Sequence, residues 1–220
     1  GHSVQVLTGF PNYPEGRIYE GYRLRLCSGE TMDGVEVLRI PHFPSHDASA
    51  VNRILSYLSF ALSAGFFGVL RVRRPDVIHV YQGPATLMIP ARVIARLRGA
   101  SVVLDIQDLW PESVTGSGML HGGALVKVLD AFCRWTYAKA DRIVVLSDGF
   151  KQRLIDRGVP ADRIEVVYNW CDEWPAHVQE CLQQEVRAEG LDPHCFNVVY
   201  AGSFGPLQNL DTVLDAAQLL

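Results

Sequence analysis

The residues that could act on a substrate are concentrated where a short apolar run ends. Residues 102–106 (Val-Val-Leu-Asp-Ile) are largely aliphatic, and the next residues are polar. The side chains with useful chemistry here are Asp105, Gln107, Asp108 and Glu112. A carboxylate at such a place can orient a hydroxyl group or remove its proton. The simpler alternative is that these acids precede a helix and cap it, with Trp110 packed in the core.

The apolar run predicts a strand buried on both faces, of the type found in parallel sheets. Gly99 precedes it and Pro111 follows it, so the run is bounded by residues that interrupt regular structure. In open α/β sheets, ligands bind in the crevice outside the carboxyl ends of the strands. We therefore expect the chemistry of this protein at the end of this strand.

Strands and helices are predicted to alternate along most of the chain. Strands are expected at residues 4–7, 35–40 (after a turn at 32–34), 77–81, 102–106, 143–146 and 164–167, and helices at 54–70, 84–98, 124–138 and 147–157. The expected buried helix positions are Leu87, Ala91, Ile94, Ala95 and Leu97, then Leu125, Val128, Leu129, Phe132 and Trp135. This alternation predicts an α/β fold with a doubly wound, Rossmann-like parallel sheet.

The composition changes after residue 172, which suggests a domain boundary. Residues 1–172 are assigned to a first domain, 173–195 to a linker with a polar helix, and 196–220 to the start of a second domain. In that second part a strand at 196–201 should enter a glycine-bearing turn and a helix with Leu210, Val213, Leu214 and Ala217 facing inward. Such a turn can bind an anion at the helix N-terminus, although a plain connection has the same pattern.

The overall composition limits the possible partners. The chain has 220 residues, 48% of them hydrophobic, and a formal net charge of −4, so a basic nucleic-acid footprint is absent. Five cysteines without a C-x-x-C pair favour neither disulfides nor a zinc site and indicate a reducing, cytoplasmic compartment.

Residues 54–70 contain no charged side chain and are followed by Arg71, Arg73 and Arg74. Three interpretations remain open: a buried helix of the α/β domain, a helix lying on a membrane surface, and a membrane span. The adjacent arginines favour contact with anionic headgroups in the second case.

The residues give little support to two other classes of enzyme. A metal-dependent hydrolase could be imagined from His42, His46, His79, Asp105 and Asp108, but their spacing matches no known ligand pattern. The Gly-x-Ser-x-Gly nucleophile motif does not occur in the sequence. The loop at 10–16, with Phe10 and Tyr13, can line a pocket or simply cover the sheet edge.

Several segments together resemble glycosyltransferase family 4 of the two-domain GT-B fold, particularly bacterial members that build O-antigen, colanic acid and related exopolysaccharides. The matching segments are residues 1–8 (GHSVQVLT), 10–14 (FPNYP), 76–79 (DVIH), 105–113 (DIQDLWPES), 140–147 (ADRIVVLS), 166–170 (VVYNW) and 200–205 (YAGSFG). The resemblance covers nearly the whole chain, and the ordered combination is more specific than any single segment.

The resemblance implies a retaining glycosyltransferase that moves a sugar from a nucleotide diphosphate sugar to a lipid-linked or saccharide acceptor, without a cofactor or an obligatory metal. The first domain would bind the acceptor and the second the donor. It also implies a peripheral enzyme of lipopolysaccharide or exopolysaccharide synthesis at the inner face of the plasma membrane. The alternative is a non-catalytic, membrane-associated binding or scaffold fragment of the same fold.

The expected site residues follow from this resemblance and from the strand ends. The expected catalytic residue is Asp108, with Asp105 and Glu112 in weaker roles. The residues expected to bind the acceptor are Gln107, Tyr13, Asn12, Tyr81 and Gln82. The residues expected to bind the donor are Gly202, Ser203, Gly205, Gln208 and Asn209. Many family members have His at the position of Gln107 and Lys at the position of Gln208.

The resemblance also implies a GT-B sheet truncated at both ends. The family's first strand and helix, with a Gly-rich donor loop, would precede Gly1, and its Glu-x7-Glu donor motif would follow Leu220. We expect the strand at residues 4–7 not to pair directly with that at 77–81, and the isolated fragment to be inactive.

Overall fold

The computed structural model describes residues 1–45, 49–116, 123–170, 191–192, 195–202, 204–205 and 208–219. The chain divides into two compact units, Gly1–Tyr168 and Asn169–Leu220, and each is described by itself. Most of the expected linker, residues 173–195, lies outside the described residues.

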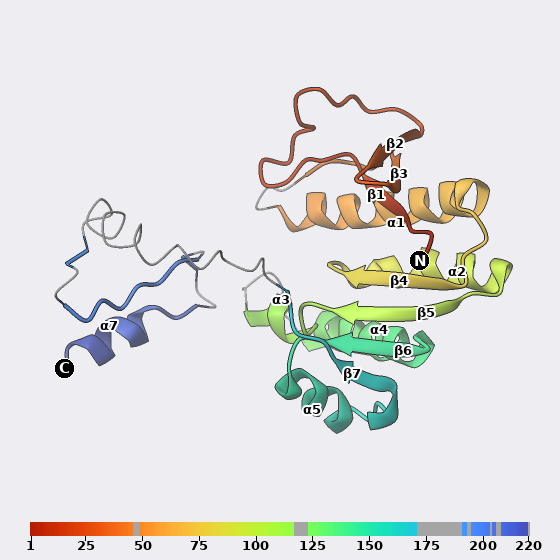
Figure 1. Ribbon diagram of the computed structural model, residues 1–220. Coiled ribbons are helices and arrows are strands. Elements are labelled where there is room, and N and C mark those ends of the chain that lie inside the picture. Colours follow the sequence, from red (N-terminus) through yellow and green to blue (C-terminus); the bar gives the residue numbers. More distant parts are fainter. Residues whose placement is uncertain are drawn as a thin grey trace. The chain divides into compact units, whose positions relative to one another are not determined.

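The first unit contains two sheets (Figure 1). The smaller has the order β1-β3-β2 and consists of β1 (Gln5–Gly9), β2 (Ser28–Met32) and β3 (Val35–Ile40). The larger has the order β4-β5-β6-β7 and consists of β4 (Val77–Gln82), β5 (Ser101–Ile106), β6 (Arg142–Val145) and β7 (Ile164–Val166). All pairs in the larger sheet are parallel, which confirms the expected α/β class.

The strand β2 was not predicted from the sequence. Its residues, Ser-Gly-Glu-Thr-Met, lack the run of β-branched and aromatic residues that usually indicates a strand. It pairs antiparallel with β3 across the predicted turn, where Asp33 and Gly34 both have positive φ values, 50° and 81°. The smaller sheet is therefore mixed, because β1 and β3 are parallel.

The two sheets do not join. Within the described residues, no hydrogen-bonded ladder connects β1 to β4, as expected. Each of these strands has a pairing partner on one side only, β3 for β1 and β5 for β4. Both therefore present an edge whose backbone groups are not used by a neighbouring strand.

The helices of the first unit are α1 (Ala50–Arg71), α2 (Met88–Arg98), α3 (Glu112–Gly116), α4 (Gly123–Lys139) and α5 (Asp148–Asp156), with short 3₁₀ turns η1 (Ala85–Leu87) and η2 (Ala161–Arg163). Two predicted end signals are confirmed. Gly99 ends α2 in the left-handed conformation, and the Ser147 hydroxyl accepts a hydrogen bond from the Phe150 N–H at the start of α5.

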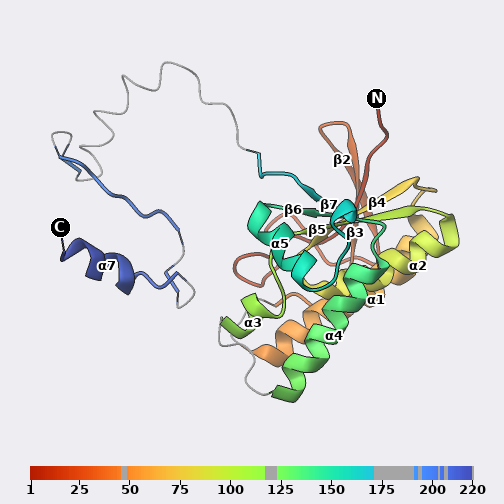
Figure 2. The ribbon, with the colours of Figure 1, turned by 90° about the horizontal axis from the view of Figure 1, so that it is seen from below.

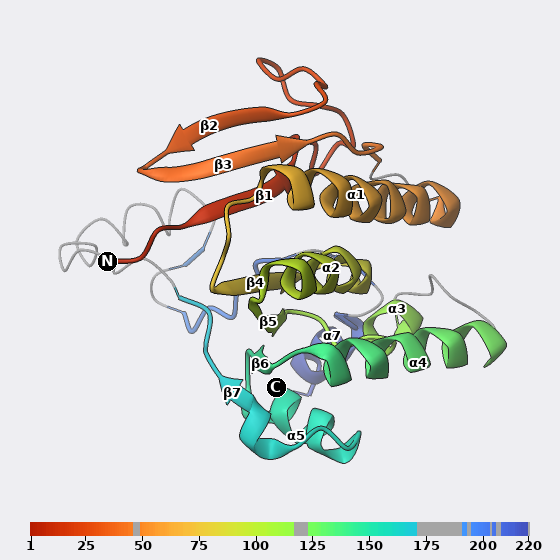
Figure 3. The same ribbon diagram turned by 90° about the vertical axis from the view of Figure 1, so that its right-hand side faces the viewer.

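Helices α1, α2 and α4 lie on one side of the strands (Figures 2 and 3). The core beneath them contains Val102, Leu104 and Ile106 of β5, with Ile143 and Val145 of β6. These residues alternate with more exposed ones along their strands, so the opposite face of the larger sheet is less covered.

The predicted inward faces of two helices were partly wrong. Leu97 of α2 is exposed, and so are Leu125 and Val128 of α4. The residues that α4 buries are Cys133, Thr136 and Tyr137. The apolar period indicated a helix correctly, but a polar threonine and a tyrosine occupy the side that meets the sheet.

The second unit also differs from expectation. Residues 196–201 do not form a strand in the structure. The expected helix is present as α7 (Asp211–Ala217), but Val213 and Leu214, predicted to face inward, are exposed. A strand needs neighbouring backbone groups to pair with, and the described residues of this unit supply none.

Candidate active site

The predicted acidic residues follow one another at the carboxyl end of β5, and each has different surroundings. The Asp105 side chain is 14% exposed and accepts a hydrogen bond from Gln107 Nε2 at 2.7 Å. A second partner comes from β4, where His79 Nε2 lies 3.4 Å from Asp105 Oδ2. Asp108 is exposed beyond the strand end. The arrangement thus holds Asp105 in place and leaves Asp108 accessible to solvent.

His79 was not among the predicted site residues. It lies two positions before Tyr81 on β4, and in the parallel register Tyr81 is opposite Asp105. Strand alternation puts His79, Tyr81 and Asp105 on the same face of the sheet. The alternation of side chains along β4, together with the pairing of β4 with β5, identifies His79 as a neighbour of Asp105. The pairing register of two strands cannot be read from one sequence.

Tyr81 and Gln82, both predicted to bind the acceptor, face opposite sides of the sheet. Tyr81 is 62% exposed on the open face, whereas Gln82 is 1% exposed on the face covered by helices. Neither polar atom of the Gln82 amide has a hydrogen-bond partner among the described residues. Adjacent residues of a strand point to opposite faces, so these two cannot contact the same group from one side.

A cavity of about 420 Å³ opens near the carboxyl ends of β1, β3 and β4. It is lined by Thr8, Gly9, Phe10, Pro11, Asn12, Tyr13, Arg39, His42, Ser56, Tyr57, Phe60, Pro84 and Leu87. Two of the predicted acceptor residues, Asn12 and Tyr13, are in this lining. Aromatic rings with a few polar groups are a common lining for small-ligand sites.

His42 lies in the wall of this cavity. Its ring stands edge-on to Phe60, with ring centroids 6.1 Å apart, and packs against Gly9, where a Cβ atom would come within 2.7 Å of it. The buried Nδ1 atom has no hydrogen-bond partner within the described residues. Burial lowers the pKa of His42 below its ordinary value of 6.5, so the imidazole is neutral at pH 7. A neutral imidazole has one nitrogen that can accept a hydrogen bond from a hydroxyl group.

The cavity and the acidic stretch are neighbours. Tyr57, in the cavity wall, lies with its ring 6.5 Å from the ring of Trp110. Trp110 belongs to the segment that continues from Asp108 to Glu112. Trp110 therefore brings the acidic stretch beside the aromatic cavity.

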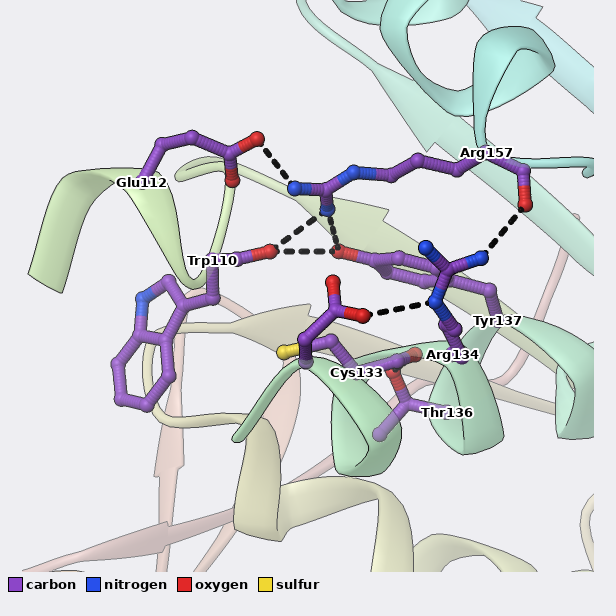
Figure 4. A network of polar contacts seen from close by, with 8 residues as sticks. Trp110, Glu112, Cys133, Arg134, Thr136, Tyr137 and Arg157 are labelled. Carbon is purple, nitrogen blue, oxygen red and sulfur yellow. Dashed lines mark hydrogen bonds and ion pairs between the residues drawn. The ribbon is translucent and has the colours of Figure 1, made fainter. Parts of the chain in front are cut away.

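A polar network fixes the segment after Asp108 (Figure 4). Arg157 donates hydrogen bonds to the Trp110 carbonyl oxygen at 2.7 Å and to Glu112, and Tyr137 Oη donates to the same carbonyl at 3.3 Å. Arg134 links the far end of the network, since it donates to the Arg157 carbonyl oxygen at 3.3 Å. This network joins α3, α4 and the end of α5.

Two members of this region are held in their neutral forms by burial. Burial raises the pKa of the Cys133 thiol to about 12 and raises that of the neighbouring Tyr137 hydroxyl. Because a thiolate is the reactive form of cysteine, Cys133 is an unreactive core residue at neutral pH. Glu112 serves this network as the ion-pair partner of Arg157.

The predicted donor-binding residues lie in the second unit, except that Ser203 is outside the described residues. The backbone N–H of Gln208 donates to the Gly205 carbonyl oxygen at 3.1 Å, and Asn209 Nδ2 donates to Thr212 Oγ1 at 2.7 Å. Asn209 has a positive φ of 44°, and Gly202 is exposed. The described ones among these residues precede α7, while their role in donor binding stays a prediction.

Of the side chains named for a metal site, His79 and Asp105 are neighbours, with 3.4 Å between His79 Nε2 and Asp105 Oδ2. No group of three or more histidine, cysteine or acidic side chains suited to a metal ion occurs among the described residues. His46, one of the five considered, lies outside them.

Comparison with known proteins agrees with these observations. The family of glycosyl transferase 4-like domains matches residues 1–170. A colanic acid biosynthesis glycosyl transferase of Escherichia coli (strain K12), WcaI, is 30% identical over 228 aligned positions, which cover 100% of this chain and 55% of WcaI. The glycosyltransferase WbjE of Pseudomonas aeruginosa is 25% identical over 177 positions, covering 77% of this chain and 44% of WbjE.

The chain spans about half the length of these curated relatives. The family match extends over the whole first unit, with its parallel α/β sheet, and the segments that suggested the resemblance lie within the matched regions. The chain belongs to the glycosyl transferase 4-like family, with a Rossmann-like domain of the GT-B type.

Proposed function

We propose that this chain is the acceptor-side part of a retaining glycosyltransferase of bacterial surface polysaccharide synthesis. The donor is a nucleotide diphosphate sugar, and the acceptor is a saccharide or a lipid-linked saccharide. The names of WcaI and WbjE support transfer of a sugar, and that of WcaI points to colanic acid or a related polymer.

The observation that supports this function best is the pairing of an acidic strand end with an aromatic cavity. Saccharides present both apolar faces and hydroxyl groups, so they suit a wall of aromatic rings with a few hydrogen-bonding atoms. Tyr13, Tyr57 and Phe60 supply the rings, and Asn12 and His42 supply polar groups. The acceptor saccharide is therefore assigned to this cavity.

Asp108 is the proposed catalytic residue. Departure of the sugar from a diphosphate builds positive charge on the sugar ring and negative charge on the phosphate, as in other oxocarbenium-like reactions. An exposed carboxylate can orient the attacking acceptor hydroxyl and accept its proton. Asp105, held by Gln107 and His79, is a positioning residue, and Glu112 is the weakest candidate because it pairs with Arg157.

The donor is assigned to the second unit, at the turn of Gly202, Ser203, Gly205, Gln208 and Asn209. Backbone N–H groups in such turns bind phosphate oxygens, and no obligatory metal is included in this scheme. We place the enzyme in the cytoplasm, peripheral at the inner face of the plasma membrane, where a lipid-linked acceptor would be presented.

The test is a pair of substitutions in the enzyme that contains both domains. Asp108→Asn should keep the melting temperature and donor binding while lowering kcat by roughly 10²-fold or more, the usual scale for a positioned acid or base. Asp105→Asn should lower kcat less and the melting temperature more, because it breaks bonds of a largely buried carboxylate. Glu165→Gln, at an exposed acid within β7, is the matched control and should change neither.

Two results would contradict this assignment. If Asp105→Asn is folded but inactive while Asp108→Asn turns over normally, the two roles are reversed. If both variants are fully active, the acids only cap the following helix.

A further inference from the structure

Helix α1 has its large apolar side chains on the outside. The residues that it buries are small: Ser56, Ala61, Ala64 and Gly68. The outward stripe consists of Val51, Leu55, Leu58, Leu62, Phe66 and Leu70, with Leu62 at 75% and Phe66 at 63% exposure. A helix that only covers a sheet places its large apolar residues toward the core. The pattern of α1 is the reverse of this.

The small residues explain why α1 remains part of the fold. A Cβ atom on Gly68 would lie 2.4 Å from Ile94 Cδ1 of α2 and 3.2 Å from Leu7 Cδ2 of β1. The helix backbone therefore packs closely against both elements. Helix α1 is long and apolar enough to cross a bilayer, and 17% of its most apolar stretch is buried. Its close packing against α2 and β1 nevertheless fits a helix that stays on the surface of the domain.

Helix α2 extends the apolar surface. It lies beside α1 in the same layer (Figure 3) and exposes Ile89, Val93 and Leu97 at a spacing of four residues. Since the buried sides of both helices face the strands, the two exposed stripes share the outer side of the layer. Contiguous apolar surface of this kind marks a contact with a protein or a membrane.

The segment that carries this surface is rich in arginine, although two of its arginines pair with acids of other elements, Arg73 with Glu36 and Arg92 with Asp141. Residues 49–99 contain seven arginines and one acid, Asp76, although the whole chain has a net charge of −4. Neither α1 nor α2 contains an acidic residue. The C-terminal ends of the two helices meet, because Arg74 Nε donates to the Arg98 carbonyl oxygen at 3.2 Å and Arg98 Nη2 to that of Val69 at 2.6 Å.

We propose that α1 and α2 together form a docking face for an anionic lipid bilayer. The outward stripes insert at the boundary between headgroups and acyl chains, and the arginines at the helix C-termini contact the anionic headgroups. A second copy of the chain fits this face less well, because the same positive charges would oppose each other across a two-fold interface.

The docking face has a consequence for the proposed site. Ser56, Tyr57 and Phe60 of α1 also line the aromatic cavity, so the helix that contacts lipid would form one wall of the acceptor site. The docking face gives the proposed membrane location a defined surface. Its test measures lipid binding alone, so that its failure is distinguishable from a failure of sugar transfer.

The experiment is flotation of the enzyme that contains both domains with vesicles of phosphatidylcholine, with and without phosphatidylglycerol. Flotation is chosen because protein aggregates remain at the bottom of the gradient. We expect binding to the anionic vesicles that weakens as salt is raised. Arg71→Glu/Arg73→Glu/Arg74→Glu should reduce it at least about 10-fold, since each basic residue near the surface contributes on the order of 1 kcal/mol.

The matched control reverses the same number of charges elsewhere. Arg17, Arg23 and Arg25 are exposed residues of the loop before β2, and their replacement by Glu should leave binding unchanged. For the apolar part, Leu62→Ser/Phe66→Ser should also reduce binding at least about 10-fold. Leu26→Ser, at an exposed leucine of the same loop, should not. Circular dichroism and melting temperature verify the fold of each variant.

Three results would overturn the proposal. The first is the absence of binding to anionic vesicles by the folded chain. The second is equal loss of binding in the control variants, which would indicate nonspecific adsorption. The third is self-association without lipid that disappears in Leu62→Ser/Phe66→Ser, together with no vesicle binding, which would make this face an interface between copies.

Discussion

At the scale of single residues, acids of similar chemistry have different surroundings at the end of β5. Asp108 is exposed, Asp105 is bonded to Gln107 and lies near His79, and Glu112 is paired with Arg157. An accessible carboxylate can reach a substrate, whereas one already paired must first give up its partner. The surroundings therefore rank Asp108 first among the three.

Arg157 should be more important for stability than its partner Glu112. Its side chain is 13% exposed, and removing the guanidinium in Arg157→Met leaves the Trp110 carbonyl oxygen with fewer donors. A loss of about 1–3 kcal/mol in the free energy of unfolding is expected. Glu112→Gln, at a half-exposed side chain, should cost less than about 1 kcal/mol. Urea denaturation measures both, and equal losses would contradict this account of the network.

His42 should make the stability of the first unit depend on pH. Its pKa in the folded chain is lowered by burial, so the unfolded chain binds more protons between the lowered value and 6.5. The stabilising contribution of the neutral form is complete above pH 6.5 and is lost as the pH falls through the folded-state pKa. The fall in melting temperature between about pH 7.5 and about pH 5.5 should be smaller in His42→Gln than in the wild type. An identical fall in both would show that other groups cause the dependence.

At the scale of elements, glycines decide how closely α1 approaches its neighbours. Gly65 and Gly68 both lie within the helix, where glycine is unfavourable relative to alanine by about 0.5–1 kcal/mol. Their surroundings differ, since a Cβ at Gly65 would be 3.9 Å from Pro90 and one at Gly68 only 2.4 Å from Ile94. The same substitution should thus have opposite effects at the two positions.

Gly65→Ala should raise the free energy of unfolding by about 0.5–1 kcal/mol through helix propensity alone. Gly68→Ala gains the same propensity but forces Ile94, which is buried, and Leu7 to move, at a cost of about 1–3 kcal/mol. We expect a net loss of stability for Gly68→Ala. Chemical denaturation of the two variants side by side provides the measurement, and a gain in both would mean that α2 shifts without cost.

At the scale of the whole molecule, the separation of the two sheets has consequences for solution behaviour. The edges of β1 and β4 have backbone groups without a strand partner in the described part of the chain. Val6 on β1 and Val77 on β4 are exposed next to these edges. Exposed edges with apolar side chains favour pairing between molecules.

We therefore expect the chain to self-associate through β1 and β4. Val6→Lys/Val77→Lys should reduce association, because lysine on an edge strand opposes pairing with another chain. Sedimentation velocity measures this best in a Leu62→Ser/Phe66→Ser background, which removes the contribution of α1. Leu26→Lys in the same background is the control. A monomeric chain without the lysines would disprove association through these edges.

The sequence alone determined the local features of this protein. Strands β4 to β7, helices α2, α4 and α5, the Ser147 cap and the Gly99 helix end were predicted correctly, because each depends on residues within a few positions of one another. The position of the acidic stretch after a parallel strand was also predicted correctly, while its role in binding stays a prediction. The short helix α3 was not predicted.

The tertiary structure decided which surfaces meet. The ion pair of Glu112 with Arg157, the contact of His79 with Asp105 and the buried side of α4 all join residues far apart in the chain. The outward apolar stripe of α1 was likewise visible only in the tertiary structure. The spacing of apolar residues in a helix predicts an apolar face, but it does not show whether another element covers that face. Strand register and helix packing depend on the surface that each element meets in the folded chain. The local pattern of a single sequence does not show which surface that is.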